Sequence, residues 1–498
     1  MPQLLPDIST KLDHILAGLP VLLPEMVLTV TFLVSIGSGL FIDRWWKQGT
    51  FVVTVAGIIL AGGYSILQLS QPTADGLLFG MLEADAFGRY TRVLIAAVCL
   101  LFVLFVHANP GFKTHPKKTA DLYSILLAVH IGLNLMGMAT SWLMVFVSIE
   151  MVSIGSYLMV GYLAKEARQT EAAMKYVLFG SVCSAVMLYG LSFLYGFTGN
   201  LDFTSAAHIQ GLAATAPLLT AMALLFVFTG IGFKLSFVPF HFWTPDVYQG
   251  APTPVTAFLS TAPKIAGVAL LARILYAWPV ESWAYQYLHT LILVSAIVTM
   301  LLGNLAALRQ THVKRMMAYS SIGHTGFLMM AVLAYSAGEY GVLLFYLSVY
   351  SLMNMGVFLF ADYIESRTGA TDVTEYNGLG PAMPVAFVGF VLLLISLTGI
   401  PPTSGFVAKL LVFTAVFGNW QLTGNPGMII LLIVGALTTV ISLFYYFKIP
   451  LNAFLRKQEG SVDIRPTQSY LVLIATLTVL AVLLLGIFPD WLVGTFQK

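Results

Sequence analysis

The feature that most constrains this chain is a series of long apolar stretches that recurs along almost its whole length. A helix needs about 20 apolar residues to span the hydrocarbon core of a bilayer, and we count fourteen stretches of this kind. Only 9% of the residues are charged and 58% are hydrophobic, against about 25% and 45–50% in soluble domains. The sequence therefore predicts an all-α polytopic membrane protein with about fourteen transmembrane helices.

The expected spans lie approximately at residues 22–42, 51–70, 93–109, 121–138, 142–163, 174–197, 218–240, 255–278, 287–305, 316–335, 340–363, 383–417, 428–447 and 470–488.

The lysines and arginines fall unevenly on the two sides of these spans, which predicts an orientation. Cytoplasmic loops accumulate them near span ends. If the N-terminus lies outside, 16 of the 24 lysines and arginines fall on the cytoplasmic side and three fall within spans. The five on the outer side are Lys11, Arg89, Arg92, Arg273 and Lys498. We therefore expect both termini outside. Residues 1–20 lack the basic start and small-residue cleavage site of a signal peptide, so we expect the first helix to be retained.

Composition also excludes several classes of function. The formal net charge is +2, and there is no basic patch interleaved with aromatic residues, so nucleic acid is not an expected partner. Cys99 and Cys183 both fall inside apolar spans, where they form neither a metal-ligand cluster nor a disulfide framework. No glycine-rich dinucleotide motif follows a strand pattern. We therefore expect neither a metal nor a cofactor on this chain.

Two apolar stretches are interrupted by glycine and proline, and we expect each to form two half-helices with an unwound middle. These stretches are 218–250 and 383–417. Each is the fourth span of a five-span block, and because five is odd, a second copy enters the membrane from the opposite side. This plan resembles inverted-repeat transporters, whose ion site lies beside the broken helices.

The expected division is into three N-terminal spans at 1–110, a first repeat at 111–279, an inverted second repeat at 280–450, and a cytoplasmic loop with a final span at 451–498.

Five ionisable residues fall within the spans and are the candidate site. Glu150 and Lys264 lie in the middle of their spans, Lys234 and Lys409 flank the two interruptions, and His324 lies in the second block. A bare charge at the bilayer centre costs about 2.5 kcal/mol or more. These groups must therefore be neutral, paired or hydrated, and together they suggest a polar line through the membrane interior.

A buried lysine suits proton transfer because burial disfavours its charged form, whereas a nearby carboxylate favours it. If Glu150 pairs with Lys234, a movement of the acid would make the lysine release or take up a proton. His324 could connect Lys264 and Lys409 through water, with Tyr319, Ser320 and Ser321 as its polar lining. The alternative is structural: a buried lysine can extend to the membrane surface or form a fixed ion pair.

Three stretches resemble a known family. They are FKLSFVPFHFWTPDVYQGAPTPVTAFLSTAPKIAG at 233–267, RMMAYSSIGHTGF at 315–327 and FVSIEMVSIGSY at 146–157. They resemble the N subunit of the respiratory NADH:quinone oxidoreductase, complex I, and the resemblance covers essentially the whole chain. The sibling M and L subunits, and related antiporter subunits, typically read LPDAH in place of TPDVY. The M subunit also typically has a glutamate at the position of Lys409.

The resemblance implies that Glu150, Lys234, Lys264, Lys409 and His324 form a proton relay driven by quinone reduction elsewhere in the complex. It implies a bacterial inner-membrane location with periplasmic termini, and K and M subunits as neighbours. Flavin mononucleotide, iron–sulfur clusters and quinone are expected on other subunits. The alternatives are a subunit of a multi-subunit cation/proton antiporter and a purely structural subunit.

Overall fold

The computed structural model describes residues 12–13, 15–16, 18–71, 74–115, 119–163, 167–334, 340–457, 465 and 470–496. Within them, fourteen helices are long and apolar enough to cross a membrane, and they correspond one to one with the expected spans. The predicted fold class is therefore confirmed. Lys11, Lys498 and most of residues 1–20, for which we predicted an outer location and a retained helix, lie outside the described residues.

The long helices of the N-terminal part are α2 (Leu23–Leu40), α3 (Gly49–Leu67) and α5 (Ala86–Ala108). The first five-span block contains α7 (Ala120–Met138), α8 (Trp142–Val160), α9 (Ala167–Thr198), α11 (Pro217–Leu235), α12 (Trp243–Gly250), α13 (Thr253–Leu259) and α14 (Ala262–Tyr276). The second contains α15 (Trp283–Ala307), α16 (Val313–Leu333), α17 (Gly341–Thr368), α18 (Pro384–Thr398), α19 (Ser404–Thr423) and α20 (Pro426–Tyr446). The chain continues into α22 (Tyr470–Ile487) and α23 (Asp490–Phe496).

Short elements connect these helices at the two ends of the bundle. They are β1 (Ala74–Gly76), β2 (Leu82–Ala84), α4 (Leu77–Gly80), α6 (Pro110–Lys113), α10 (Ala206–Ala214), α21 (Lys448–Pro450), the 3₁₀ turns Ile42–Arg44, Gln68–Ser70 and Val373–Tyr376, and a π-helical turn at Leu451–Leu455. The strands β1 and β2 form an antiparallel hairpin.

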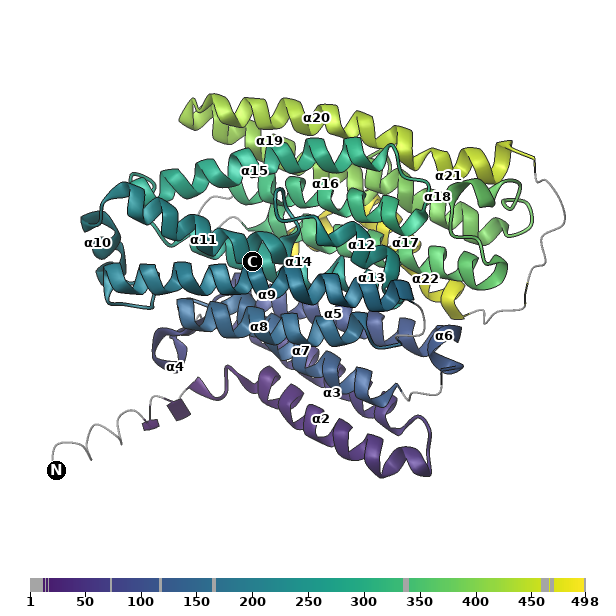
Figure 1. Ribbon diagram of the computed structural model, residues 1–498, viewed down its shortest axis with the longest axis horizontal. Helices are drawn as coiled ribbons and strands as arrows, with labels where there is room; N and C mark the ends of the chain where they lie inside the picture. Colours follow the sequence, from purple (N-terminus) through teal and green to yellow (C-terminus); the bar gives the residue numbers. More distant parts are fainter. Residues whose placement is uncertain are drawn as a thin grey trace.

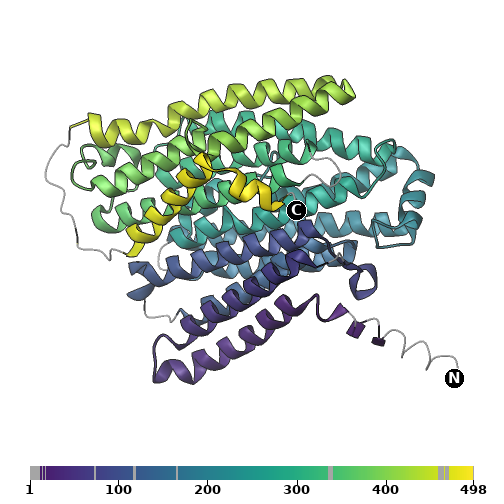
Figure 2. The same cartoon turned by 180° about the vertical axis from the view of Figure 1, so that it is seen from behind.

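The long helices run side by side in one bundle (Figure 1). Helices α2 and α3 lie at one edge, and α19 and α20 lie at the opposite edge. Helices α4 and α10 mark one end of the bundle, and α6 and α21 mark the other. Figure 2 shows that α22 and α23 lie across the face opposite to that of Figure 1. The core is formed mainly by α13, α14, α16 and α17, whose side chains are almost entirely buried.

Two helices begin earlier than expected. Helix α9 begins at Ala167 and not near residue 174, and α5 begins at Ala86 and not near residue 93. The Asp85 side chain accepts a hydrogen bond from the Gly88 amide at 2.8 Å and caps α5, as acidic N-cap residues do. The extra turns of α5 carry Arg89 and Arg92, and these arginines are buried.

Arg89 and Arg92, which we assigned to the outer side, are thus buried within the bundle and not exposed at its surface. The Arg92 guanidinium donates a hydrogen bond to a Glu25 carboxylate oxygen at 2.9 Å, and Arg89 donates to the carbonyl oxygen of Gln68 at 2.8 Å. Each basic group has polar partners inside the bundle, which offset the cost of burying it.

Arg273, at the end of α14, anchors the β1–β2 hairpin region to the first block. Its guanidinium donates to the Glu83 carboxylate at 3.1 Å and to the Asp85 carboxylate at 2.7 Å. Its side chain is only 7% exposed.

The Arg92–Glu25 pair yields a stability prediction. Replacing Glu25 with glutamine preserves the side-chain shape but leaves Arg92 without its negative partner, although the Asn134 amide that donates to Glu25 at 3.0 Å remains. Breaking a buried pair from one side costs about 3–5 kcal/mol. We expect Glu25→Gln to lower the temperature at which the protein unfolds in detergent. The exposed Glu281→Gln should not change it; equal shifts in the two variants would contradict this prediction.

A second prediction concerns the loop that joins α15 and α16. Burial, reinforced by the Lys314 charge, lowers the pKa of His312 from 6.5 to about 4. The folded ring therefore stays neutral at a pH where the unfolded ring binds a proton, so stability falls as the pH drops from 6.5 to about 4.

We expect His312→Gln to remove that part of the pH dependence. Thermal stability of the protein in detergent should be compared at pH 7.5 and pH 5, for the wild type and the variant. At pH 7.5 the ring is neutral in both states, so that point is the internal control. Parallel losses on acidification in both proteins would show that His312 does not contribute.

Candidate functional site

The three intramembrane lysines and His324 are buried inside the bundle. Their exposed fractions are 3% for Lys234, 1% for Lys264, 5% for Lys409 and 4% for His324. Glu150 is half-buried. None of the three lysines extends to the membrane surface, so their ammonium groups must be solvated by the protein interior.

The first helix interruption lies directly after Lys234. Helix α11 ends at Leu235 because Ser236 adopts a left-handed backbone with φ of 62°. The Trp243 indole nitrogen then donates to the carbonyl oxygen of Phe233 at 3.0 Å. The Val238 amide donates to the Thr299 hydroxyl of α15 at 3.0 Å. The unwound segment is thus held on both sides, and Lys234 is fixed in the last turn of α11.

Lys234 and Glu150 interact electrostatically, but they do not form a direct ion pair. The Lys234 ammonium donates to the Ser153 hydroxyl of α8 at 3.2 Å. The Glu150 carboxylate accepts a hydrogen bond from the Ser184 hydroxyl of α9. A Glu150–Lys234 pair that opens and closes therefore stays a prediction, and serine hydroxyls hold the two groups in this arrangement.

Lys264 on α14 is held by neutral oxygens of α16. Its ammonium donates to the Ser321 carbonyl at 2.7 Å, to the Ser321 hydroxyl at 2.6 Å and to the Thr325 hydroxyl at 2.8 Å. These acceptors match the three donors of an ammonium group. Among the described residues, no carboxylate is paired with it, so neutral oxygens alone hold this ammonium group.

His324 lies among tyrosine hydroxyls. Its Nδ1 is 2.9 Å from the Tyr346 hydroxyl of α17, and its Nε2 is 3.3 Å from the Tyr446 hydroxyl of α20. Tyr446 is also hydrogen-bonded to the Ser320 hydroxyl at 2.5 Å. His324 interacts electrostatically with Lys409 and Lys264. A connection from His324 through water to both lysines stays a prediction.

The second interruption positions Lys409. Helix α18 ends at Thr398, and Gly399 follows with φ of 89°, a conformation that favours glycine. The Lys409 ammonium, on the second half-helix α19, donates to the carbonyl oxygens of Leu397 and Thr398 at 3.0 and 2.9 Å. These carbonyls form the negative end of α18. Lys234 likewise lies at the C-terminal end of a first half-helix.

One hydroxyl connects the first interruption to the centre of the site. Thr325 accepts from Lys264 and donates to the carbonyl oxygen of Leu235 at 3.1 Å, next to Lys234. Ser321, which also binds Lys264, is hydrogen-bonded to the Tyr350 hydroxyl at 2.8 Å. Direct hydrogen bonds do not join Glu150 to Lys234, or His324 to either lysine. Proton transfer across these gaps requires bridging water.

Sequence reasoning missed most of the hydroxyl groups of the site. It named Ser320 and Ser321. It did not name Ser153, Ser184, Thr325, Tyr346, Tyr350 and Tyr446. Tyr319, which it also named, has no side-chain hydrogen bond among the described contacts. The four-residue spacing of hydroxyl side chains was a signal for three of the missed residues, Thr325, Tyr346 and Tyr350. Ser321 and Thr325, and Tyr346 and Tyr350, are spaced by four, which places each pair on one helix face.

A separate charge cluster lies at the basic end of the bundle, around the aspartate of the TPDVY stretch. The Asp246 carboxylate accepts from Lys175 of α9 and from Arg315 of α16, both at 2.6 Å. It therefore ties a helix of the first block to a helix of the second. Lys175 and Arg315 are among the 16 lysines and arginines that the orientation rule assigns to one side, and the structure adds this contact.

Comparison with known proteins identifies the family. Residues 139–442 match the family described as NADH:quinone oxidoreductase/Mrp antiporter, transmembrane. The chain is 37% identical over 467 residues to NADH-quinone oxidoreductase subunit N 2 of Chloroherpeton thalassium. That alignment covers 92% of this chain and 89% of the relative.

Two solved structures share the fold. One is a chain of respiratory complex I from Thermus thermophilus, with a TM-score of 0.77, 28% identity, and coverage of 95% of this chain and 98% of that one. The other is a chain of the Mrp complex from Dietzia sp., with a TM-score of 0.81 and 19% identity over 95% of this chain and 96% of that one; it shows the fold alone. The chain therefore belongs to the NADH:quinone oxidoreductase/Mrp antiporter family, and within it to the N subunits of NADH-quinone oxidoreductase.

Proposed function

We propose that this chain is a proton-translocating subunit of the membrane arm of NADH:quinone oxidoreductase, complex I. Quinone reduction in other subunits supplies the energy, and this chain moves protons through Glu150, Lys234, Lys264, His324 and Lys409. The chain carries no redox chemistry of its own. Flavin mononucleotide, iron–sulfur clusters and quinone are bound by other subunits of the complex.

The observation that supports this function best is the environment of Lys264. A fully buried ammonium bound by hydroxyl and carbonyl oxygens, without a carboxylate, is not a fixed structural ion pair. Thr325 links it to the end of α11, and tyrosine hydroxyls extend from it toward His324. Hydroxyl groups both donate and accept protons, so this arrangement suits the relay of a proton between the two interrupted helices.

The finer features of the proposal concern location and neighbours. The chain lies in a bacterial inner membrane with both termini on the periplasmic side, and K and M subunits flank it. The 16 lysines and arginines assigned to one side support this orientation. The burial of Arg89, Arg92 and Arg273 further reduces the positive charge of the opposite side. The two five-span blocks act as inverted repeats around the interrupted helices.

The alternative is a subunit of a cation/proton antiporter, and the fold shared with the Mrp chain makes this comparison relevant. Such a subunit would use the same buried lysines but draw its energy from an ion gradient. The 37% identity to a subunit N and the TPDVY motif favour the complex I function over the antiporter.

Purification from native membranes distinguishes the two functions. We expect an affinity-tagged chain to be recovered with iron–sulfur subunits and with quinone reductase activity that acidifies one side of reconstituted vesicles. Recovery without iron–sulfur subunits, together with sodium- or potassium-driven proton exchange in vesicles, would instead support the antiporter. A tagged chain with Lys409→Met should co-purify normally, because Lys409 lies inside the bundle.

A further inference from the structure

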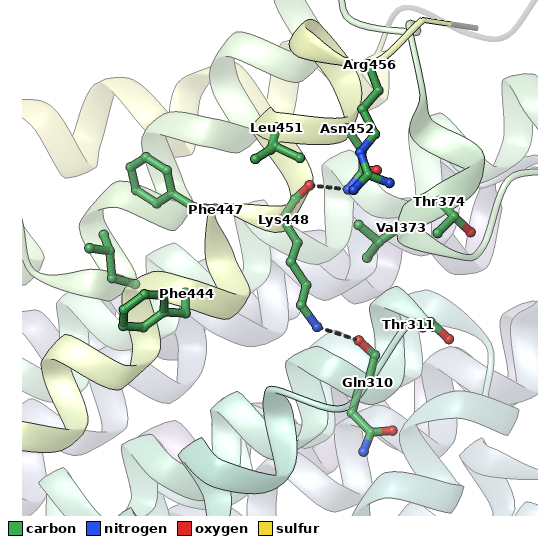
Figure 3. A pocket seen from close by; sticks show the side chains of 11 residues that line it. Gln310, Thr311, Val373, Thr374, Phe444, Phe447, Lys448, Leu451, Asn452 and Arg456 are labelled. Atoms are coloured by element: carbon green, nitrogen blue, oxygen red, sulfur yellow. Dashed lines mark hydrogen bonds between the residues drawn. The ribbon is translucent and has the colours of Figure 1, made fainter. Parts of the chain in front are cut away.

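A cavity of about 510 Å³ lies at the end of α20, outside the proposed proton path. Figure 3 shows the side chains that line it, which come from α20, α21, the π-helical turn, the loop before α16 and the Val373–Tyr376 turn. The candidate membrane span of this segment is Pro426–Leu455, so Lys448 lies in its last turns and Arg456 directly follows it. The cavity therefore lies near the level at which phospholipid headgroups meet the protein.

One wall of the cavity is basic. The Lys448 ammonium donates to the carbonyl oxygens of Leu308 at 2.5 Å and Gln310 at 3.3 Å (Figure 3). An ammonium has three donors, so one is left for a ligand. Arg456 also lines the cavity, and its side chain is exposed. Among the described residues, no carboxylate lines the cavity and neither cation forms an ion pair.

A buried acceptor lies beside these two cations. Asn452 is only 5% exposed, and its amide nitrogen donates to the Lys448 carbonyl at 2.6 Å. Its Oδ1 has no hydrogen-bond partner among the described residues. A buried polar atom without a partner costs about 1–3 kcal/mol. The described residues therefore supply neither a negative charge for Lys448 and Arg456 nor a hydrogen-bond donor for Asn452.

The opposite wall is apolar and continues along α20. An exposed stripe runs down one face of the helix toward the membrane interior, with the three- and four-residue spacing of a single helix face. Its residues are Ile430, Ile433, Leu437, Val440, Phe444 and Phe447, each between 45% and 64% exposed. Phe444 and Phe447 also line the cavity. An elongated apolar chain that starts in the cavity can therefore lie along the stripe.

We propose that this cavity binds an anionic phospholipid with a glycerol headgroup. The phosphodiester lies between Lys448 and Arg456, a headgroup hydroxyl donates to Asn452 Oδ1, and an acyl chain lies against Phe444, Phe447 and the stripe below them. A helix of a neighbouring subunit is the competing occupant of the stripe, and the site of labelling below distinguishes the two. Phosphatidylcholine has no hydroxyl donor and carries no net negative charge.

Photolabelling of the intact complex tests this proposal. The purified complex would be reconstituted in phosphatidylcholine vesicles with a trace of phosphatidylglycerol that carries a photoactivatable diazirine in its acyl chain. We expect label on the peptide that contains Phe444 and Phe447, and competition by unlabelled phosphatidylglycerol. A basic residue near the membrane surface contributes about fivefold to the binding of an anionic lipid. Labelling should therefore fall about fivefold in Arg456→Gln and further in Lys448→Gln/Arg456→Gln.

Lys457→Gln is the matched control, because Lys457 is adjacent and exposed but does not line the cavity. Its labelling should equal that of the wild type. Arg456→Gln alters an exposed side chain, so misfolding cannot account for its effect. Three results would overturn the proposal: equal labelling by a phosphatidylcholine probe, equal losses in Arg456→Gln and Lys457→Gln, or a label found only on a neighbouring subunit.

Discussion

Replacing Lys234 with methionine is expected to stop proton transfer through this subunit while the complex stays assembled. The side chain is buried, and its one direct hydrogen bond is to the Ser153 hydroxyl, so an apolar chain of similar length fits the site. Removal of a proton-transferring group typically lowers the rate of a step by about 10²–10⁴-fold. The measurement is the number of protons translocated per quinone reduced, in vesicles that carry the intact complex.

Lys234→Arg separates proton transfer from a structural role. Arginine keeps the positive charge next to Glu150 but does not release its proton. If Lys234 transfers protons, arginine should fail as methionine does. If it only stabilises the fold, arginine should restore translocation. The exposed Lys47 provides a control, because Lys47→Met removes a lysine far from the site. Unchanged translocation in Lys234→Met would favour a purely structural subunit.

Lys264→Met is expected to have an effect of similar size for a different reason. Lys264 donates hydrogen bonds to Ser321 and Thr325. These contacts place it between the interrupted helix α11 and the tyrosine hydroxyls near His324. Methionine removes the titrating group and leaves those oxygens without their donor. We expect proton transfer to fall by about 10²-fold or more, and assembly to be less stable than in Lys234→Met.

Thr325→Val provides the graded comparison for Lys264. It removes the hydroxyl that joins Lys264 to the Leu235 carbonyl but leaves the lysine with its two Ser321 acceptors. The expected loss in protons per quinone is intermediate between the wild type and Lys264→Met. If Thr325→Val and the wild type translocate equally, the Thr325 link is not part of the path. If Lys264→Met and the wild type translocate equally, the lysine itself is dispensable.

Much of the architecture could be predicted because membrane spans have a strong signal in single sequences. Uninterrupted apolar length fixes the number of helices, and glycine and proline mark the two interruptions. The start of α5 was harder to predict because Arg89 and Arg92 resemble loop residues. Their burial depends on Glu25 and Gln68, which belong to other helices, and sequence separation carries no information about such contacts.

The candidate site was predicted in its charges but not in its hydrogen bonds. An ionisable residue within a span is conspicuous, because charge is costly there. The hydroxyls of Tyr346 and Tyr446 are not conspicuous, since tyrosine is also common at membrane interfaces. The separation of Glu150 from Lys234 by serine contacts likewise depends on how α8, α9 and α11 pack.

The two interrupted helices have a consequence for how this site tolerates substitution. Leu397 and Thr398 bind Lys409 through main-chain carbonyl groups, and Leu235 is joined to Thr325 in the same way. Every residue type carries a carbonyl group. The side chains of Leu397, Thr398 and Leu235 can therefore vary without removing these acceptors, whereas a change that extends either half-helix would withdraw them. At Lys409, the geometry of the helix end, more than the identity of the neighbouring side chains, determines which oxygens the ammonium group meets.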